Sequence, residues 1–229
     1  SSQVGCRMGC RFCASTQGGR VRNLTAGEIA GEIYAAMADM GQRVSHIVLM
    51  GIGEPLDNFD NVMDFLSIIS SPEGVNIGMR NISLSTCGLV PMIDKLAEKK
   101  LQLTLSISLH APNDAMRSGM MPVNDAYPVE QLIDACRSYQ RETGRRISFE
   151  YAMVHGVNDS DATARELARL IRGMGAHVNL IPINPVDGSP YSATDAANVK
   201  RFQETLLKLG VNATVRRRLG SDISAACGQ

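Results

Sequence analysis

Three cysteines near the start of the chain have a spacing suited to metal chemistry. They lie in the segment Cys6-Arg-Met-Gly-Cys10-Arg-Phe-Cys13, and no fourth cysteine or histidine stands close to it. Three thiolates can hold three irons of a 4Fe-4S cluster and leave the fourth iron open to a ligand. We therefore predict that Cys6, Cys10 and Cys13 bind such a cluster and that chemistry starts at its open iron.

A structural zinc site, simple burial and disulfide bonds are the alternative explanations for these cysteines. Structural zinc usually takes four protein ligands, whereas the next cysteine is Cys87, in a different kind of segment. Six cysteines in 229 residues are too sparse for a secreted disulfide framework, and three of them share one loop. The cysteine pattern favours a reduced, cytoplasmic protein.

The composition sets the size and class of the protein. With 229 residues and 44% hydrophobic residues, the chain can form one core, so we expect a single domain over 1–229. No stretch approaches the ~20 apolar residues of a membrane span, and the start of the chain has no apolar segment typical of a signal peptide. We expect no membrane partner.

The charges are balanced overall but unevenly placed. The net charge is zero, which leaves no global basic footprint for nucleic acid. Arginines nevertheless precede the first acidic residue, Glu28, and recur near the end: Arg7, Arg11, Arg20, Arg22, Arg216, Arg217 and Arg218. If the two ends meet in space, they form a basic patch. Alternatively, these arginines bind acidic side chains or a cofactor carboxylate.

Apolar periodicity predicts helices that alternate with strands. The first helix, 25–40, starts at Thr25 with Glu28 as a capping box, and carries Ile29, Ile33, Met37 and Met40 on one face. Further helices are predicted at 58–70, 90–99, 128–142, 160–174 and 193–209, and strands at 45–50, 81–85, 102–108, 146–153, 177–183 and 211–215. Strands joined by such helices form a parallel sheet through right-handed crossovers. The fold class is α/β, with a partial, open β/α barrel.

Polar residues follow several predicted strands directly. In a β/α barrel, the loops after the strands share one face and carry the function. Backbone groups at Gly53 and Glu54 could receive an amino group, and serine and asparagine side chains could bind a ribose and a carboxylate. Such a pocket suits S-adenosylmethionine, although each residue alone could instead serve a turn, a cap or the core. The candidate cofactor-binding residues are Gly53, Glu54, Ser85, Ser108, Leu109, His110 and Asn184.

These motifs resemble the radical S-adenosylmethionine superfamily. The cysteine spacing, with an aromatic residue before Cys13, is similar to that superfamily. The segments SSQVGC, NLTAGEI, MGIGEPL, LSTCGLVP, SISLHAPND, GVNDS, LIPINP and RRRLGSDISAACGQ resemble its branch of rRNA and tRNA adenine carbon-2 methyltransferases. The resemblance extends from residue 1 to residue 229.

The resemblance implies a catalytic role for Cys227. In this family the matching cysteine accepts a methyl group from one S-adenosylmethionine, and a radical derived from a second one removes hydrogen from that methyl group. The methylene radical then adds to adenine. Release requires a general base and a second cysteine, which forms a disulfide with Cys227. By the resemblance, both groups, the first barrel strand and a small RNA-binding domain would precede residue 1, so we expect a fragment whose full turnover fails or stalls.

The expected partners also follow from the resemblance. They are 23S rRNA, tRNA and a flavodoxin-type electron donor, with the protein as a monomer. Two alternatives remain open. One is methylation of carbon-8 of the same adenine, which confers antibiotic resistance, and the other is a non-catalytic iron-sulfur or RNA-binding module.

Overall fold

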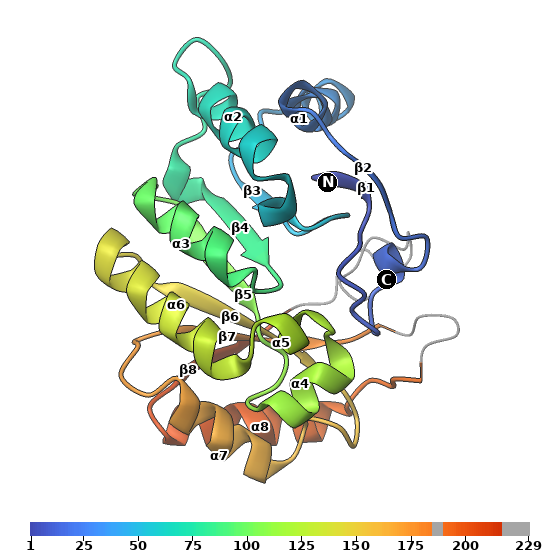
Figure 1. The fold of residues 1–229 in the computed structure, drawn as a ribbon, viewed down its shortest axis with the longest axis vertical. Helices are drawn as coiled ribbons and strands as arrows, with labels where there is room; N and C mark the ends of the chain where they lie inside the picture. Colours follow the sequence, from blue (N-terminus) through green and yellow to red (C-terminus); the bar gives the residue numbers. More distant parts are fainter. Residues whose placement is uncertain (185–189, 217–229) are drawn as a thin grey trace.

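A six-stranded parallel sheet forms the centre of the molecule (Figure 1). The structure is a computed structural model, and it describes residues 1–184 and 190–216. The strands lie in sequence order: β3 (Ile47–Leu49), β4 (Ile82–Thr86), β5 (Thr104–Ser108), β6 (Ile147–Met153), β7 (His177–Pro182) and β8 (Asn212–Val215). Within the described residues the sheet is not closed, because β3 and β8 are its edges. The predicted open α/β architecture is confirmed.

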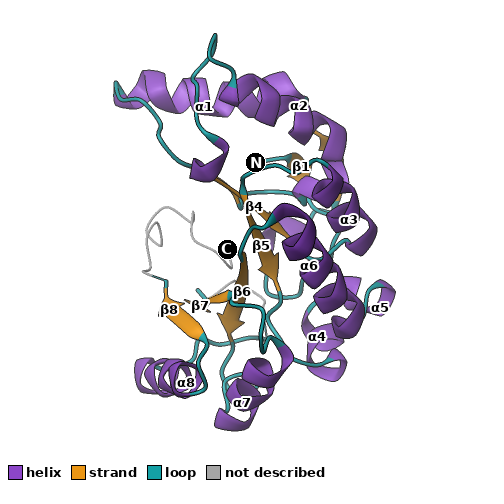
Figure 2. Ribbon diagram, turned by 90° about the vertical axis from the view of Figure 1, so that its left-hand side faces the viewer, coloured by secondary structure: helices purple, strands orange, loops and turns teal. Residues whose placement is uncertain are grey.

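Helices surround the outer side of the sheet. Figure 2 shows the strands inside an arc of helices that is open on one side. The connecting helices are α1 (Ala26–Met40), α2 (Phe59–Ser70), α3 (Val90–Glu98), α6 (Val129–Thr143), α7 (Asp161–Leu170) and α8 (Ala196–Lys208). Five of them start within one residue of the prediction and α8 starts three residues later than predicted, and their buried faces pack on the strands in one hydrophobic core.

The first helix shows why the periodicity was informative. The Thr25 side chain accepts from the Glu28 backbone, and the Glu28 side chain accepts from the Thr25 backbone, so the predicted capping box is confirmed. On the predicted apolar face Ile29 is buried, and Ile33 and Met37 are half-buried. Met40 is 57% exposed, because the helix ends there and its last turn extends past the core. The prediction for Met40 was wrong.

Several short elements were not predicted. An antiparallel hairpin pairs β1 (Gln3–Gly5) with β2 (Arg20–Asn23) and carries the cysteine loop, including the 3-10 turn η1 (Ala14–Thr16). Two short helices, α4 (Asp114–Met120) and α5 (Val123–Ala126), follow β5. The 3-10 turns η2 (Pro55–Asn58) and η3 (Met79–Asn81) precede α2 and β4. These elements contain too few residues for a hydrophobic period to emerge.

Candidate functional site

One pocket lies where the strands end. Its volume is about 610 Å³, which is within the usual range for small-molecule sites. It is bounded by the cysteine loop on one side and by the residues that follow β3, β4 and β5 on the other. Eight of the residues singled out from the sequence line it: Cys6, Cys10, Cys13, Gly53, Glu54, Ser85, Ser108 and His110.

The cysteine loop folds into a tight turn. The Cys13 N–H donates to the Cys10 carbonyl at 3.1 Å, and the Thr16 hydroxyl donates to the Cys13 carbonyl at 2.9 Å. Burial raises the pKa of Cys10 to about 12, with further contributions from the nearby Cys13 and Cys6 thiols. The three thiols are therefore close enough to influence one another, and a bound cation would favour their thiolate forms.

The donor set suits a cluster better than a single ion. Within the part of the chain that the structure describes, no three His, Cys, Asp or Glu side chains are arranged to hold one metal ion. A 4Fe-4S cluster does not need this arrangement, because each cysteine binds a different iron. Three thiols that line one side of a pocket of this volume therefore fit a cluster with an open fourth iron.

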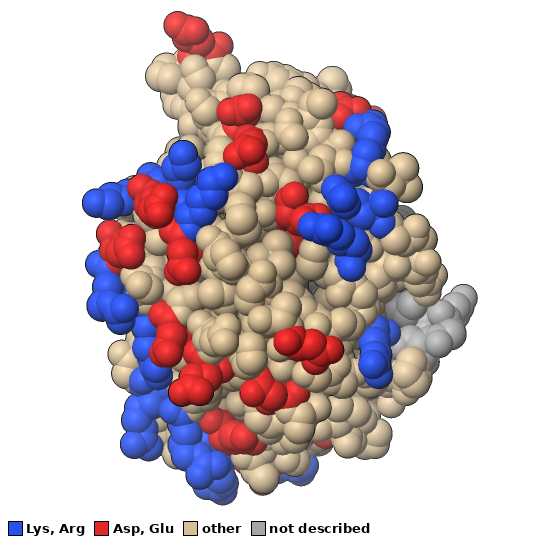
Figure 3. Space-filling view, viewed as in Figure 1, with Lys and Arg blue, Asp and Glu red and all other residues tan. Residues whose placement is uncertain are grey.

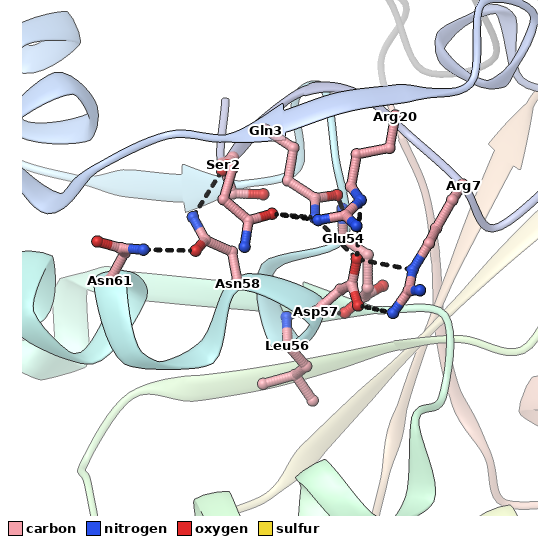
Figure 4. A network of polar contacts seen from close by, with 10 residues as sticks. Ser2, Gln3, Arg7, Arg20, Glu54, Leu56, Asp57, Asn58 and Asn61 are labelled. Carbon is pink, nitrogen blue, oxygen red and sulfur yellow. Dashed lines mark hydrogen bonds and ion pairs between the residues drawn. The ribbon is translucent and has the colours of Figure 1, made fainter.

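A polar network holds the hairpin against η2 (Figure 4). Asn58 donates to the carbonyls of Ser2 and Leu24, at 2.8 and 2.7 Å. The Gln3 amide donates to Asp57 at 2.9 Å, and its carbonyl accepts from the Glu54 N–H at 2.9 Å. These bonds fix the cysteine loop relative to β3, so the first residues of the motif SSQVGC position the cluster loop.

Gly53 and Glu54 have distinct structural roles. Gly53 has a φ of 101°, and a Cβ there would lie 2.6 Å from the Gln3 Cβ, so glycine is required. The buried Glu54 carboxylate accepts from the backbone N–H of Leu56 at 3.0 Å and of Cys87 at 2.8 Å. Burial raises the pKa of Glu54. Its side chain thus links the segments after β3 and β4.

His110 is held as a neutral ring. Its Nδ1 accepts from the Ala152 N–H at 2.9 Å, so the Nε2 carries the proton. Burial, together with the Arg117 charge, lowers the pKa of His110 to about 3. The Phe12 ring meets the imidazole edge to face, with centroids 4.9 Å apart. His110 also has a φ of 58°, a conformation that non-glycine residues rarely adopt.

Two of the candidate residues do not line the pocket. Leu109 is fully buried in the main hydrophobic core. Asn184 is buried two residues after β7 but is not among the pocket-lining residues. Cys227 lies outside the described residues. The five cysteines within them are all free, so the disulfide implied for Cys227 is not supported.

Sequence reasoning missed two polar residues near the pocket, Glu150 and Arg117, and named Arg216 only as part of a basic run. Glu150 on β6 lines it and accepts from the Asn179 side chain at 2.8 Å, and burial raises the pKa of Glu150. Arg216 lines it from the end of β8, and Arg117 lies behind it. The inward position of Glu150 could have been found from strand alternation, since a lone acid in an apolar strand is unusual.

Most of the N-terminal arginines have acidic partners. Arg7 and Arg20 both contact Asp57, and Arg22 binds Glu28 at 2.8 Å. Arg217 and Arg218 lie outside the described residues. In Figure 3, basic and acidic groups lie together near the hairpin on the right, and Lys and Arg also gather along the left edge. The pairing alternative thus holds for three of the four N-terminal arginines.

Comparison with known proteins gives the class of the fold and site. The family model described as the radical SAM superfamily matches residues 1–170, and the chain belongs to this superfamily. Its cofactors are accordingly a 4Fe-4S cluster and S-adenosylmethionine. No helix within residues 1–184 and 190–216 is long and apolar enough to cross a membrane.

Individual relatives of the chain narrow the class of protein further. A probable dual-specificity RNA methyltransferase RlmN from Clostridium novyi is 54% identical over all 229 residues, which cover 67% of that protein. A probable dual-specificity RNA methyltransferase RlmN from Desulforamulus reducens is 56% identical over all 229 residues, which cover 65% of that protein. A radical SAM methyltransferase from Sphaerobacter thermophilus has a TM-score of 0.96 and 50% identity, with all of this chain and 68% of that one covered. The chain spans about two thirds of the length of these relatives.

Proposed function

We propose that this chain is the catalytic core of an RNA methyltransferase that methylates carbon-2 of adenine in 23S rRNA and in tRNA. The observation that carries the proposal is the convergence of three thiols and of the loops after β3, β4 and β5 on one pocket. The similarity to RlmN proteins over all 229 residues of this chain supports the RNA substrate. A flavodoxin-type donor and a monomeric state are part of the same proposal.

The pocket residues have separate tasks in this proposal. Cys6, Cys10 and Cys13 hold the cluster, while Gly53 and Glu54 offer backbone groups to the amino end of S-adenosylmethionine. Ser85 and Ser108 provide hydroxyl groups for its ribose and carboxylate. The His110 Nε2–H is a fixed neutral donor, since its Nδ1 is occupied by Ala152. When bound, the cluster supplies one electron that cleaves S-adenosylmethionine to a deoxyadenosyl radical.

Cys227 is the proposed methyl carrier. Its thiolate attacks the methyl carbon of S-adenosylmethionine, the carbon–sulfur bond of the sulfonium breaks, and S-adenosylhomocysteine leaves. Removal of one hydrogen atom from the S-methyl group then gives a carbon radical that adds to carbon-2 of adenine. A direct polar transfer is unsuitable, because carbon-2 of adenine is a poor nucleophile.

Peptide mass spectrometry of Cys227 tests this proposal. Protein that has been loaded anaerobically with the cluster is compared with and without added S-adenosylmethionine. We expect one methyl group on Cys227, and none when Cys10 is replaced in Cys10→Ala. An unmodified Cys227 beside an intact cluster would contradict the carrier role. Mass analysis of digested RNA then distinguishes a carbon-2 from a carbon-8 product.

A further inference from the structure

Arg117 is an arginine with no exposed surface, in the middle of α4. Burying a charged group is costly unless its donors are satisfied and its charge is balanced. Within the described residues, however, Arg117 forms no salt bridge with an acidic side chain. Its charge is therefore placed in the interior without direct neutralisation, which requires an explanation.

The guanidinium joins the ends of two neighbouring strands. Its Nη2 donates to the carbonyls of Cys87 and Ser108, at 2.6 and 3.2 Å, and its Nε donates to the Leu109 carbonyl at 3.1 Å. Cys87 follows β4, Ser108 ends β5 and Leu109 follows it, so one rigid group fixes both pocket walls. Neighbouring Gly88 has a φ of 104°, and a Cβ there would lie 3.3 Å from the Arg117 Nη2.

Two carboxylates, Glu54 and Asp114, are linked to Arg117 through neutral groups. On the pocket side, the Cys87 N–H donates to Glu54 while the Cys87 carbonyl accepts from Arg117. On the far side, Arg117 donates to the Asn124 carbonyl oxygen at 3.1 Å, and the Asn124 amide donates to Asp114 at 2.9 Å. Because neither acid touches the guanidinium, its charge acts on the surroundings of the pocket.

The nearest groups on the pocket side are thiols and the neutral imidazole. Arg117 interacts electrostatically with Cys10 and Cys87, and it contributes to the lowered pKa of His110. A cluster that gains an electron becomes more negative, and a buried positive charge stabilises the more negative state. The guanidinium is thus in a position to act on the redox centre as well as on the pocket walls.

We propose that Arg117 is a positioning residue that fixes the ends of β4 and β5 around the cofactor pocket and that its buried charge favours electron uptake by the cluster. This inference rests on the cluster proposed at Cys6, Cys10 and Cys13. It assigns Arg117 no contact with substrate. The Arg117 side chain has two tasks in this proposal: its planar guanidinium donates several hydrogen bonds, and it carries a positive charge.

Redox titration of the loaded protein, followed by electron paramagnetic resonance, tests the charge. Arg117→Gln keeps donors but has no charge, Arg117→Met keeps only bulk, and Arg117→Lys keeps the charge without the fork. We expect Arg117→Gln and Arg117→Met to lower the ratio of reduced to oxidised cluster about tenfold at a given potential. This corresponds to a reduction potential that is lower by about 59 mV for one electron. Arg117→Lys should keep the wild-type potential but bind S-adenosylmethionine several-fold more weakly.

Arg145→Met is the matched control. Arg145 is half-buried and donates to the Leu103 carbonyl at 3.3 Å, before the opposite end of β5. We expect the cluster in Arg145→Met protein to have the wild-type reduction potential. An unchanged potential in Arg117→Gln and Arg117→Met, or a tenfold shift in Arg117→Lys, would overturn the inference. If Arg117→Gln and Arg117→Met do not fold, the potential of the cluster in Arg117→Lys alone decides whether the inference holds. Failure of wild-type protein to bind iron would instead refute the proposed cluster.

Discussion

At the residue scale, the pocket contains a histidine that is kept uncharged. His110 is buried, its Nδ1 accepts from the Ala152 N–H, and a positive guanidinium lies nearby. All three features disfavour the imidazolium form, because the buried ring would lose an acceptor and face a like charge. A donor that stays neutral across physiological pH suits a site that binds a zwitterionic ligand.

The neutral ring has a consequence for stability. The pKa of His110 is about 3 in the folded protein, below the unfolded value of about 6.5. The contribution of the neutral ring to the free energy of unfolding is therefore present above pH 6.5 and is lost as pH falls toward 3. We expect wild-type protein to lose about 2 kcal/mol more than His110→Asn between pH 7 and pH 5. Urea unfolding at both pH values measures this difference.

Asparagine is the suitable replacement for this test. Its Oδ1 can accept from the Ala152 N–H, it does not titrate, and asparagine tolerates the positive φ of this position. All other titrating groups are common to both proteins, so they cancel in the comparison. Equal pH dependence of the two proteins would contradict the depressed pKa.

At the element scale, the cysteine loop depends on a small hairpin that contributes no strand to the main sheet. The β1–β2 hairpin forms a separate two-stranded sheet. Its attachment to η2 relies on the Asn58 amide and on the Gln3 side chain (Figure 4). Loss of this attachment should therefore affect the metal site before it affects the sheet.

We expect Asn58→Leu to reduce the iron content per chain by more than half after reconstitution. The substitution removes both donors and leaves the carbonyls of Ser2 and Leu24 without that partner, at a cost of about 1–3 kcal/mol. Far-UV circular dichroism should change little, because the main sheet does not include the hairpin. Iron analysis and hydrogen exchange of the hairpin provide the measurements.

Asn198→Leu is the control for this prediction. Asn198 lies in the first turn of α8 and donates to the Asp159 carboxylate at 2.7 Å, so it loses comparable hydrogen bonds away from the cysteine loop. Its iron content should equal that of the wild type. Full iron loading of Asn58→Leu would show that the hairpin does not need this anchor.

At the scale of the whole molecule, two basic regions differ in their relation to the pocket. Arg11 is exposed on the cysteine loop and is adjacent in the chain to Cys10, which lines the pocket. A second group, formed by Arg137, Arg141 and Arg172, surrounds a shallow pocket between the end of α6 and the start of β7. RNA that presents an adenine to the cofactor pocket must approach the first region.

We expect Arg11→Ser to weaken RNA binding and to lower the slope of log K against log salt by about 0.7–0.9, the loss of one phosphate contact. Arg141→Ser, at the opposite end of the sheet, should leave both quantities unchanged. A salt titration of RNA binding checks this, with iron content measured in parallel. Equal losses in both variants would place the RNA on a broader surface.

The long elements could be predicted because their burial is periodic. Helix α1 shows its capping box and its apolar face in the sequence, and the parallel strands read as short apolar segments between helices. The convergence of Gly53, Ser85 and Ser108 also followed, because parallel strands end on one face. The same logic placed Leu109 with them, although strand alternation turns its side chain into the core.

Other features depend on contacts between distant segments. The strand β2 has no buried residue, so no alternation marks it in the sequence. Arg117 reads as a solvent-facing arginine of a polar segment, because only the fold shows that the carbonyls of Cys87 and Ser108 surround it. Likewise, the sharing of Asp57 by Arg7 and Arg20 arises from hairpin geometry.

The edge-to-face contact between Phe12 and His110 gives the molecule a built-in spectroscopic reporter. Phe12 belongs to the cysteine loop and His110 to the segment after β5, and their rings are 4.9 Å apart at an interplanar angle of 84°. Ring currents of Phe12 therefore shift the imidazole resonances of His110 only while the cysteine loop keeps its contact with His110. The chain has only four histidines, so the His110 signals can be followed individually. Loop opening, cluster assembly and cofactor release can thus be timed from a single aromatic proton.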